Sequence, residues 1–338
     1  MPKLTVLMPV YNAERFLAAA IESILNQSFR DFEFLIIDDC STDRSVEVIR
    51  AFPDPRIRLY RNDRNLGISA TLNRGIALAE SAYIARMDSD DVSHPDRLQK
   101  QYDFIQANPD GALYSCWVRV VDENRQLVRQ DVFESAYYYY NLNFICWIYH
   151  PTVVYRKDAV QDVGGYTTPY AEDFELFWQL TRKYKHYHQP EVLLDYRVTG
   201  QSLHQVVRKQ EYEQAQQEQL LRNVRYYAGA DYSIPASYLE CYRHNFKPLL
   251  EQQDVQEIVQ CIRELDYLSA SIVAKENVNR DPEAIRAAAA YKRQFIIDFF
   301  ARNLPRRKGT LLLLKLGQLP LLVKIASSHT LRKLGLPC

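Results

Sequence analysis

The sequence predicts an α/β fold, a mainly parallel sheet covered by helices on both faces, followed by a helical C-terminal region. Over the first ninety residues, short apolar runs alternate with segments of helical periodicity. Apolar runs without polar alternation are typical of strands buried on both faces of a parallel sheet. Beyond residue 205 the chain changes to long helical segments rich in Gln, Glu, Arg and Tyr.

The predicted elements follow one another in a regular order. The apolar runs that predict strands lie at residues 4–10, 32–37, 56–60 and 82–87. Apolar residues at helical spacing predict helices at 13–25 and 69–79, and a shorter helix through Val46 and Ile49. Ser41, Thr42 or Asp43 can cap that shorter helix. Four strands alternating with helices favour a doubly wound parallel sheet.

The pattern changes after the fourth predicted strand. Ser93 as a cap and Pro95 as a first helical residue predict a helix that runs to about residue 107. Residues 112–133 indicate β-structure around a turn at 122–125, and the chain up to about 200 indicates mixed sheet and loop. The tyrosines at 137–140 fit either a packed or a substrate-facing patch. Further helices are expected in four segments: 205–228, 236–252, 254–274 and 282–301.

Composition and charge limit the classes of function. The 338 residues are 47% hydrophobic and 25% charged with zero net charge, which is typical of a soluble globular protein and not of a nucleic-acid binder. The six cysteines form no Cys-x-x-Cys pair. Residues 1–3 lead directly into the first strand without a signal peptide, so we expect a reducing, cytoplasmic location.

The C-terminal residues 302–338 form a basic, apolar tail. No acidic residue follows Asp298, whereas eight basic residues do. Lys315, Pro320 and Lys324 interrupt the apolar stretch, so a membrane-spanning helix is not expected. Two alternatives are open: a helix that makes peripheral contact with an anionic membrane, or a helix docked on the protein itself.

Three carboxylates, Asp88, Asp90 and Asp91, follow the fourth predicted strand within four positions. Like charges this close repel one another and raise each other's pKa, and a bound cation offsets that repulsion. In an open α/β sheet, ligands bind at the carboxyl ends of the strands. The cluster therefore predicts a divalent-metal site, with a solvated acidic turn as the alternative.

The first and second predicted strands also end in polar or aromatic groups. Tyr11 offers a flat face on which a nucleobase can stack, and Asp38 and Asp39 can accept hydrogen bonds from a base or a ribose. Neither a glycine-rich dinucleotide fingerprint nor a P-loop motif is present. Three such strand ends at one edge of the sheet predict a nucleotide site.

These motifs, in this order, resemble the inverting family 2 glycosyltransferases of the GT-A fold. The resemblance covers about residues 3–200 and rests on five motifs: Pro-Val-Tyr-Asn at 9–12, Ile-Leu-Asn-Gln-Ser at 24–28, Asp-Asp-x-Ser-x-Asp at 38–43, Asn-Leu-Gly at 65–67 and Asp-Ser-Asp-Asp at 88–91. It implies a GT-A domain at 1–204, with a nucleotide-sugar half at 1–110 and an acceptor half at 111–204, followed by a helical region at 205–301.

The resemblance also implies a donor, a metal and the residues that bind them. The donor would be a nucleotide-diphosphate sugar, with UDP as the expected nucleotide, and Mn²⁺ or Mg²⁺ would bridge its diphosphate. The residues implied for the base are Pro9, Tyr11 and Asp39. Those implied for the ribose and the metal are Asp88, Asp90 and Asp91, with either Asp90 or Asp91 as the direct ligand. Arg74 and Arg86 are candidates for phosphate or base contacts, with a structural role as the alternative.

A general base is the remaining requirement for sugar transfer. Glu172 and Asp173 precede a predicted helix and resemble the family's Glu-Asp motif. The motif implies that Asp173 removes the acceptor proton and that Glu172 supports it or binds the acceptor. Without the resemblance, these carboxylates are simply favourable partners of the helix dipole. His150 is either a substrate contact or a buried structural residue, and Thr199 stands where many relatives have a histidine, so no histidine ligand is expected.

The sequence predicts a metal-dependent inverting glycosyltransferase that acts on a glycan or lipid-linked acceptor in cell-surface polysaccharide synthesis. A sugar-nucleotide pyrophosphorylase is one alternative, although the glycine-rich basic loop usual in those enzymes is missing at 9–13. A non-catalytic nucleotide-sugar-binding scaffold is another, although the candidate catalytic carboxylates are all present. No nucleic-acid partner is expected.

Overall fold

The computed structural model describes residues 1–199 and 209–321. Residue contacts divide the chain into two compact units. The first comprises residues 1–142, 146–216 and 277–279, and the second comprises 143–145, 217–276 and the chain from 280 onward. The domain boundary predicted at residue 204 lies outside the described residues.

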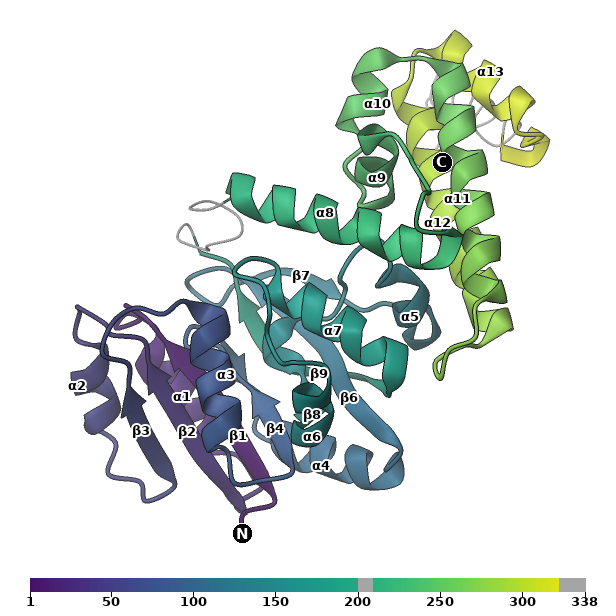
Figure 1. The fold of residues 1–338 in the computed structure, drawn as a ribbon. Coiled ribbons are helices and arrows are strands. Elements are labelled where there is room, and N and C mark those ends of the chain that lie inside the picture. The colour runs from purple at the N-terminus through teal and green to yellow at the C-terminus, as the bar shows by residue number, and fades with distance from the viewer. Residues whose placement is uncertain (200–208, 322–338) are drawn as a thin grey trace. The chain divides into compact units, whose positions relative to one another are not determined.

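The first unit is built on one sheet of nine strands. The strands are β1 (Leu4–Val10), β2 (Phe32–Asp38), β3 (Ile57–Arg61), β4 (Tyr83–Arg86), β5 (Val92–Ser93), β6 (Gly111–Val121), β7 (Leu127–Asp131), β8 (Val154–Arg156) and β9 (Lys185–Arg197). Their order is β3-β2-β1-β4-β8-β6-β9-β5, with β7 paired to β6 (Figure 1). Strands β1 to β4 are mutually parallel, whereas β8 is antiparallel to both β4 and β6.

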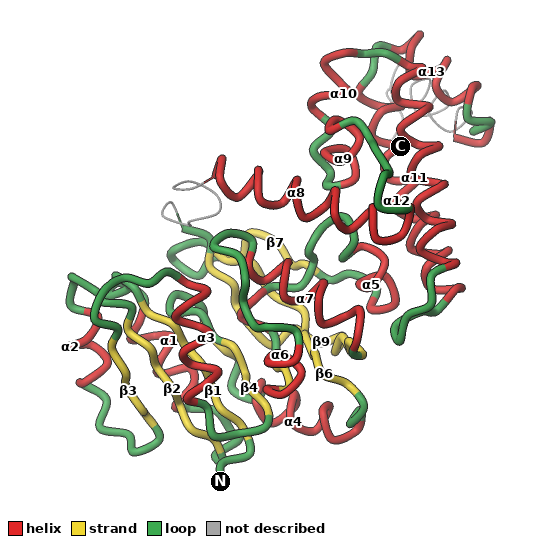
Figure 2. The backbone as a smooth tube through the Cα atoms, viewed as in Figure 1, coloured by secondary structure: helices red, strands yellow, loops and turns green. Residues whose placement is uncertain are grey.

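Helices cover both faces of the parallel half of this sheet. One core cluster joins the even-numbered residues of β1 to α1 (Leu17–Leu25), α2 (Ser45–Arg50) and α4 (Arg97–Ala107). The opposite face is covered by α3 (Ile68–Leu78), where Gly75 lies against the side chain of Leu7. Helices lie on both sides of the sheet (Figure 2), and because side chains alternate along a strand, β1 is buried on both faces. The predicted α/β class is therefore confirmed.

We expect Gly75→Ala to destabilise the first unit, although alanine is the better helix former. A Cβ atom at residue 75 would lie 2.2 Å from Cδ1 of Leu7, whose side chain is fully buried, so the packing between α3 and β1 would have to shift. Overpacking costs about 1–3 kcal/mol, against a gain in helix propensity of about 1 kcal/mol. Urea unfolding measures the difference, with Ala77→Gly on the exposed side of α3 as a control for propensity alone. A higher midpoint for Gly75→Ala would contradict this packing.

The rest of the first unit differs from the predictions at one helix start. The turn at 122–125 is confirmed, and it joins β6 to the antiparallel β7. The helix expected from Pro95 begins at Arg97 instead, because Ser93 pairs with Leu194 as part of β5. In the tyrosine run, Tyr138 and Tyr140 are packed in the interior. The remaining elements are the 3-10 helices η1 (Ser135–Tyr137) and η2 (His150–Thr152), and the helices α5 (Tyr138–Asn141), α6 (Lys157–Asp162) and α7 (Glu172–Lys183).

The second unit is helical over its described residues. Its helices are the part of α8 (Lys209–Ala228) beyond residue 216, α9 (Ala236–Tyr242), α10 (Lys247–Gln252), α11 (Val255–Ala274), α12 (Pro282–Asn303) and α13 (Arg306–Lys315). Asp254 and Asp281 cap α11 and α12 by accepting backbone N–H groups of the first turn. The prediction of one helical segment at 236–252 is wrong, because the chain forms two helices separated at His244, which has φ 68°. Pro248 has no N–H to donate to the carbonyl of residue 244, so one continuous helix cannot form there.

The C-terminal tail begins with a short helix. On α13, Leu312 and Leu313 are buried within the second unit, whereas Leu311 and Leu314 are 44% and 52% exposed. The helix ends before Gly317, which adopts φ 68°. Within the described part of the chain, no helix has the length and apolar character needed to cross a membrane. Residues 322–338 of the predicted tail lie outside the described residues.

Candidate active site

The predicted site residues gather where β1 separates from β4. On one side, β1 pairs with β2 as far as Val10 and Asp38, whereas pairing with β4 stops at Leu7 and Arg86. Strand β2, the next along the chain, lies on one side of β1, and β4 lies on its other side. The strand order therefore reverses at this position, which is a topological switch point of the sheet. Pro9 lies beyond the last residue of β1 that pairs with β4. The N–H that proline lacks is therefore not needed for a hydrogen bond between these two strands.

The acidic cluster after β4 forms a compact set of oxygen ligands. Asp88, Asp90 and Asp91 each place one carboxylate oxygen within 4.8 Å of the others. Asp91 is 1% exposed; its Oδ1 accepts the N–H of Arg197 at 2.7 Å, and its buried Oδ2 has no hydrogen-bond partner among the described residues. Native proteins rarely leave a buried polar atom unpartnered unless a ligand or ion satisfies it. A hard divalent cation fits this donor set.

Burial and mutual repulsion set the protonation of these carboxyl groups. Burial, together with the charge of Asp88, raises the pKa of Asp90 to about 7. Burial, followed by the charges of Asp90 and Asp88, raises the pKa of Asp91 well above its usual range. Without an added cation, the cluster therefore holds fewer than three negative charges at neutral pH.

Two arginines hold the acidic cluster in place. Arg86, 2% exposed, forms an ion pair with Asp88. Although burial disfavours its charge, the pairing with Asp88 raises the pKa of Arg86. Arg197 donates from Nε to the carbonyl of Asp90 at 2.7 Å, and from Nη1 to the carbonyl of Glu123 at 2.7 Å. Sequence reasoning missed Arg197, because it binds backbone atoms far away in the chain.

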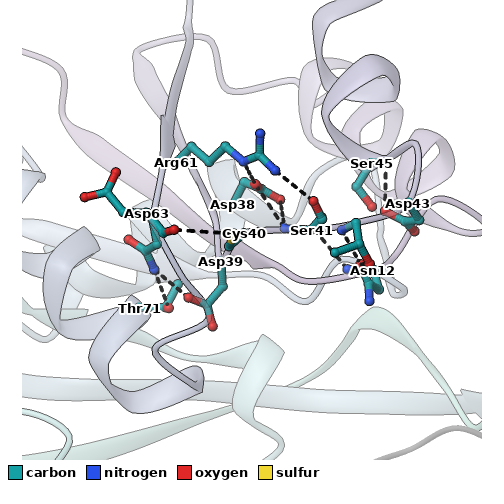
Figure 3. Close-up of polar contacts among 12 residues, drawn as sticks. Asn12, Asp38, Asp39, Cys40, Ser41, Asp43, Ser45, Arg61, Asp63 and Thr71 are labelled. Carbon is teal, nitrogen blue, oxygen red and sulfur yellow. Dashed lines mark hydrogen bonds and ion pairs between the residues drawn. The ribbon is translucent and has the colours of Figure 1, made fainter.

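The loops after β1 and β2 are joined to each other beside the exposed ring of Tyr11. Tyr11 is 50% exposed, and Asn12 after it has φ 49°. The N–H of Asn12 donates to Oγ of Ser41 at 3.0 Å, and its Oδ1 accepts the N–H of Thr42 at 2.8 Å (Figure 3). These bonds fix the backbone from which Tyr11 projects.

Asp39 and Arg74 support a third loop. The Asp39 carboxylate accepts the side-chain amide of Asn62 at 2.6 Å and the N–H groups of Leu66 and Gly67 at 2.8 and 2.9 Å. Arg74 donates to the carbonyl of Arg61 at 2.9 Å and to the side chain of Asn62. Both predicted binding residues thus have structural partners, and their contacts with a base or phosphate stay predictions.

The predicted catalytic pair begins α7 after a strained residue. Ala171 is buried in the left-handed conformation, with φ 49° and ψ 39°. A non-glycine residue in this conformation costs about 1–2 kcal/mol and is frequent at functional sites. Asn12 and Cys40, which follow the predicted base-binding residues, also have positive φ. The three strained positions adjoin three segments of the predicted site.

Glu172 is buried beside a neutral histidine. It is 6% exposed, its Oε1 lies 3.7 Å from Nδ1 of His150, and its buried Oε2 has no hydrogen-bond partner in the part of the chain that the structure describes. Burial, and then the charge of Asp173, raises the pKa of Glu172 to about 8. Burial, and then the charge of Arg86, lowers the pKa of His150 well below its usual range, while its Nε2 is bonded to the hydroxyl of Tyr166 at 2.7 Å. His150 is thus a buried, neutral residue that adjoins the pair.

The carboxylates of the acidic cluster and of the predicted catalytic pair influence the same side chain, Tyr212. Burial raises the pKa of Tyr212, which lies on α8, and the carboxylates of Glu172, Asp173 and Asp88 raise it further. The interaction between charges weakens with distance, so both groups of carboxylates lie close to the phenol of Tyr212. The structure therefore brings together residues from the ends of β4 and α7 that are far apart in the sequence.

Comparison with known proteins identifies the family. A family model described as Glycosyl transferase family 2 matches residues 5–164. The O-antigen biosynthesis glycosyltransferase WbnJ of Escherichia coli is 30% identical over 211 residues, which cover 59% of this chain and 81% of WbnJ. The chain belongs to glycosyl transferase family 2. The chain spans about half the length of two other curated relatives that it matches, 46% and 45%.

Solved structures support the fold of this chain. S. aureus TarS in complex with UDP-GlcNAc matches 89% of this chain and 92% of its own, with a TM-score of 0.57 and 16% identity. A mannosyltransferase from Pyrobaculum calidifontis in complex with GDP-Man and Mn²⁺ matches 87% of each chain, with a TM-score of 0.51 and 16% identity. At this level of identity the likeness concerns the fold, and it confirms the predicted GT-A architecture.

Proposed function

We propose that this glycosyltransferase transfers a sugar from a nucleotide-diphosphate donor to a glycan or lipid-linked acceptor, with inversion and with the help of a divalent metal. The observation that supports this best is the buried, unpartnered Oδ2 of Asp91 beside Asp88 and Asp90 at the switch point. Mn²⁺ or Mg²⁺ would be held by these carboxylates. When bound, the ion would neutralise the charge of the departing nucleoside diphosphate.

The chain's own residues have distinct tasks in this proposal. Tyr11 stacks on the nucleobase, Pro9 and Asp39 shape the pocket for the base, and Asp88 contacts the ribose. Asp173 takes the proton from the acceptor hydroxyl, which attacks the anomeric carbon from the side opposite the diphosphate and so inverts that centre. Because its pKa is about 8, Glu172 is protonated at neutral pH and can donate a hydrogen bond to the acceptor.

The donor and the pathway are proposed from the relatives. TarS in complex with UDP-GlcNAc supports a UDP-sugar, and the mannosyltransferase in complex with GDP-Man and Mn²⁺ supports a nucleotide sugar with Mn²⁺. WbnJ, named for O-antigen biosynthesis, supports a role in cell-surface polysaccharide synthesis.

The transferase proposal is tested by incubating the purified protein with a panel of UDP-, GDP- and dTDP-sugars, with Mn²⁺ or with EDTA. Release of nucleoside diphosphate is the readout, because it reports both transfer and slow donor hydrolysis. We expect release from at least one donor with Mn²⁺ and its loss with EDTA. Absence of both binding and release for every donor in the presence of metal would refute the proposal.

We expect Glu172→Gln to keep transfer within about tenfold of the wild type at neutral pH and to change the alkaline side of the pH profile. Below its pKa of about 8 the Glu172 carboxyl is neutral, like an amide. As the pH rises through that value, Glu172 ionises and can no longer donate a hydrogen bond to the acceptor, so wild-type activity should fall. The variant has nothing to ionise there, so its activity should persist. Measuring kcat between about pH 6 and 9.5 tests this, and equal alkaline falls in both proteins would refute it.

We also propose that α13 contacts an anionic membrane surface, so that the enzyme is a peripheral protein on the inner face. Leu311 and Leu314 are exposed on α13, and the exposed Arg307 and Lys315 lie on the same face by helical spacing. Apolar residues flanked by basic ones are typical of interfacial helices.

The double variant Leu311→Asn, Leu314→Asn should bind vesicles that contain phosphatidylglycerol about tenfold more weakly or worse, because two apolar side chains are lost from the interface. Cosedimentation measures this. Tyr267→Asn, at a residue 49% exposed on α11, is the control. Equal binding by the wild type and the double variant would exclude α13 as the contact.

A further inference from the structure

Two tyrosines stand beside the candidate catalytic pair, outside the part of the chain that the family model matches. That match ends at residue 164, whereas Tyr170 precedes α7 and Tyr212 lies near the start of α8. Their ring centroids are 5.3 Å apart with the planes inclined by 57°, and both side chains are partly exposed. The two rings and the candidate catalytic pair therefore lie in the same part of the chain, beyond the family-model match.

The position of Tyr170 is fixed by the loop that precedes α7. Oγ1 of Thr168 donates to the carbonyl of Tyr170 at 3.1 Å, and the carbonyl of Thr168 accepts Oγ of Ser69 on α3. Asn73 of α3 binds both backbone groups of Tyr166, accepting its N–H at 2.9 Å and donating to its carbonyl at 2.8 Å. A loop anchored to a helix at three points holds its aromatic side chain in a fixed place, ready to bind a ligand.

Hydrogen-bonding groups adjoin these rings. Glu172 lies two residues after Tyr170, and its buried Oε2 has no hydrogen-bond partner. The carboxylates of Glu172, Asp173 and Asp88 all act on the phenol of Tyr212, so the ring lies close to them. Apolar ring faces beside convergent oxygen acceptors match the chemistry of a pyranose, which has C–H faces and a rim of hydroxyl groups.

We propose that Tyr170 and Tyr212 form a platform for the terminal pyranose ring of the acceptor, with Glu172 binding one of its hydroxyl groups. The acceptor is then a saccharide end, and not the bare phosphate of a lipid carrier. Charge supports this choice, because Asp173 and Asp88 would repel an acceptor phosphate, whereas Arg86, buried beside them, is already paired with Asp88. This inference rests on the proposed transferase function.

The test compares transfer to a panel of p-nitrophenyl glycopyranosides with hydrolysis of the donor by water. Tyr212→Leu and Tyr170→Leu should each lower the ratio of transfer to hydrolysis about tenfold, chiefly through a higher acceptor KM, since tenfold corresponds to the loss of one good ring contact. Tyr212→Phe and Tyr170→Phe keep the ring and should stay within about threefold. Tyr267→Leu, at an exposed tyrosine on α11, is the matched control.

Each outcome separates this inference from the function on which it rests. If the leucine variants unfold, Tyr212→Trp replaces them: its larger ring should preserve or lower the acceptor KM, and a raised KM would overturn the platform. A wild type that hydrolyses its donor but glycosylates no glycoside overturns the saccharide platform and leaves the transferase intact. Leucine variants whose ratio of transfer to hydrolysis equals that of the wild type also overturn the platform and leave the transferase intact. A wild type that neither binds nor hydrolyses any donor refutes the transferase itself.

Discussion

Asp173→Asn should lower the rate of sugar transfer by about 10²–10⁴-fold, the usual contribution of a general base, with little change in the Kd for the donor. The amide keeps the size of the carboxylate but cannot take the acceptor proton. Single-turnover transfer measures the rate, and equilibrium titration with the nucleotide sugar measures donor binding. Asp162→Asn is the control, because Asp162 is a 47% exposed aspartate on α6, which pairs with Lys183.

Asp173 is preferred over Glu172 as the base for a physical reason. Burial keeps Glu172 protonated up to about pH 8, so at neutral pH it has no free charge with which to accept a proton. Asp173 is partly exposed in the first turn of α7, where the helix dipole favours a negative charge. If Glu172→Gln loses transfer and Asp173→Asn does not, the two roles are exchanged and our assignment is wrong.

The parts of the site that follow strand ends could be predicted from the sequence. The runs at 4–10 and 82–87 are apolar apart from Thr5 and Arg86, so β1 and β4 were predictable, and with them the positions of Tyr11 and Asp88. Parallel strands place their carboxyl ends at one edge, so the gathering of these residues follows from the fold class. The α/β fold class could be predicted because the apolar runs and the segments of helical spacing agree with one another.

The tertiary partners could not be predicted in the same way. Arg197 binds the carbonyls of Asp90 and Glu123, and a backbone carbonyl leaves no mark in the sequence. Asp39 was predicted at the correct strand end, yet its carboxylate holds the loop that includes Gly67, a pairing that only the folded chain reveals. The strained Ala171 gives no signal either, because alanine is typical of helices and not of left-handed turns.

Asp91→Asn should weaken Mn²⁺ binding by about 100-fold or more, because it removes a charged oxygen ligand. Substitution of a residue that only hydrogen-bonds a metal ligand already lowers metal affinity by about 10- to 100-fold. Electron paramagnetic resonance of free Mn²⁺ measures the affinity without any assay of activity. Thermal unfolding gives a second readout, since Mn²⁺ should raise the Tm of the wild type and leave that of the variant almost unchanged. Equal Mn²⁺ affinities would show that Asp91 is not a ligand.

Asp91→Asn should also stabilise the metal-free protein. This result would distinguish a carboxylate that serves ligand binding from one that stabilises the fold. Burial, Asp90 and Asp88 raise the pKa of Asp91 in the folded chain, so the unfolded chain binds fewer protons and wild-type stability falls as the pH rises above about 4. Asparagine does not titrate, so the gain should grow with pH over that range. Asp195 is the matched contrast: it is 2% exposed but bonded to Arg119 and His94, which outweigh burial and lower its pKa. Asp195→Asn should therefore destabilise the protein, and a loss of stability in both variants would show that Asp91, too, serves the fold.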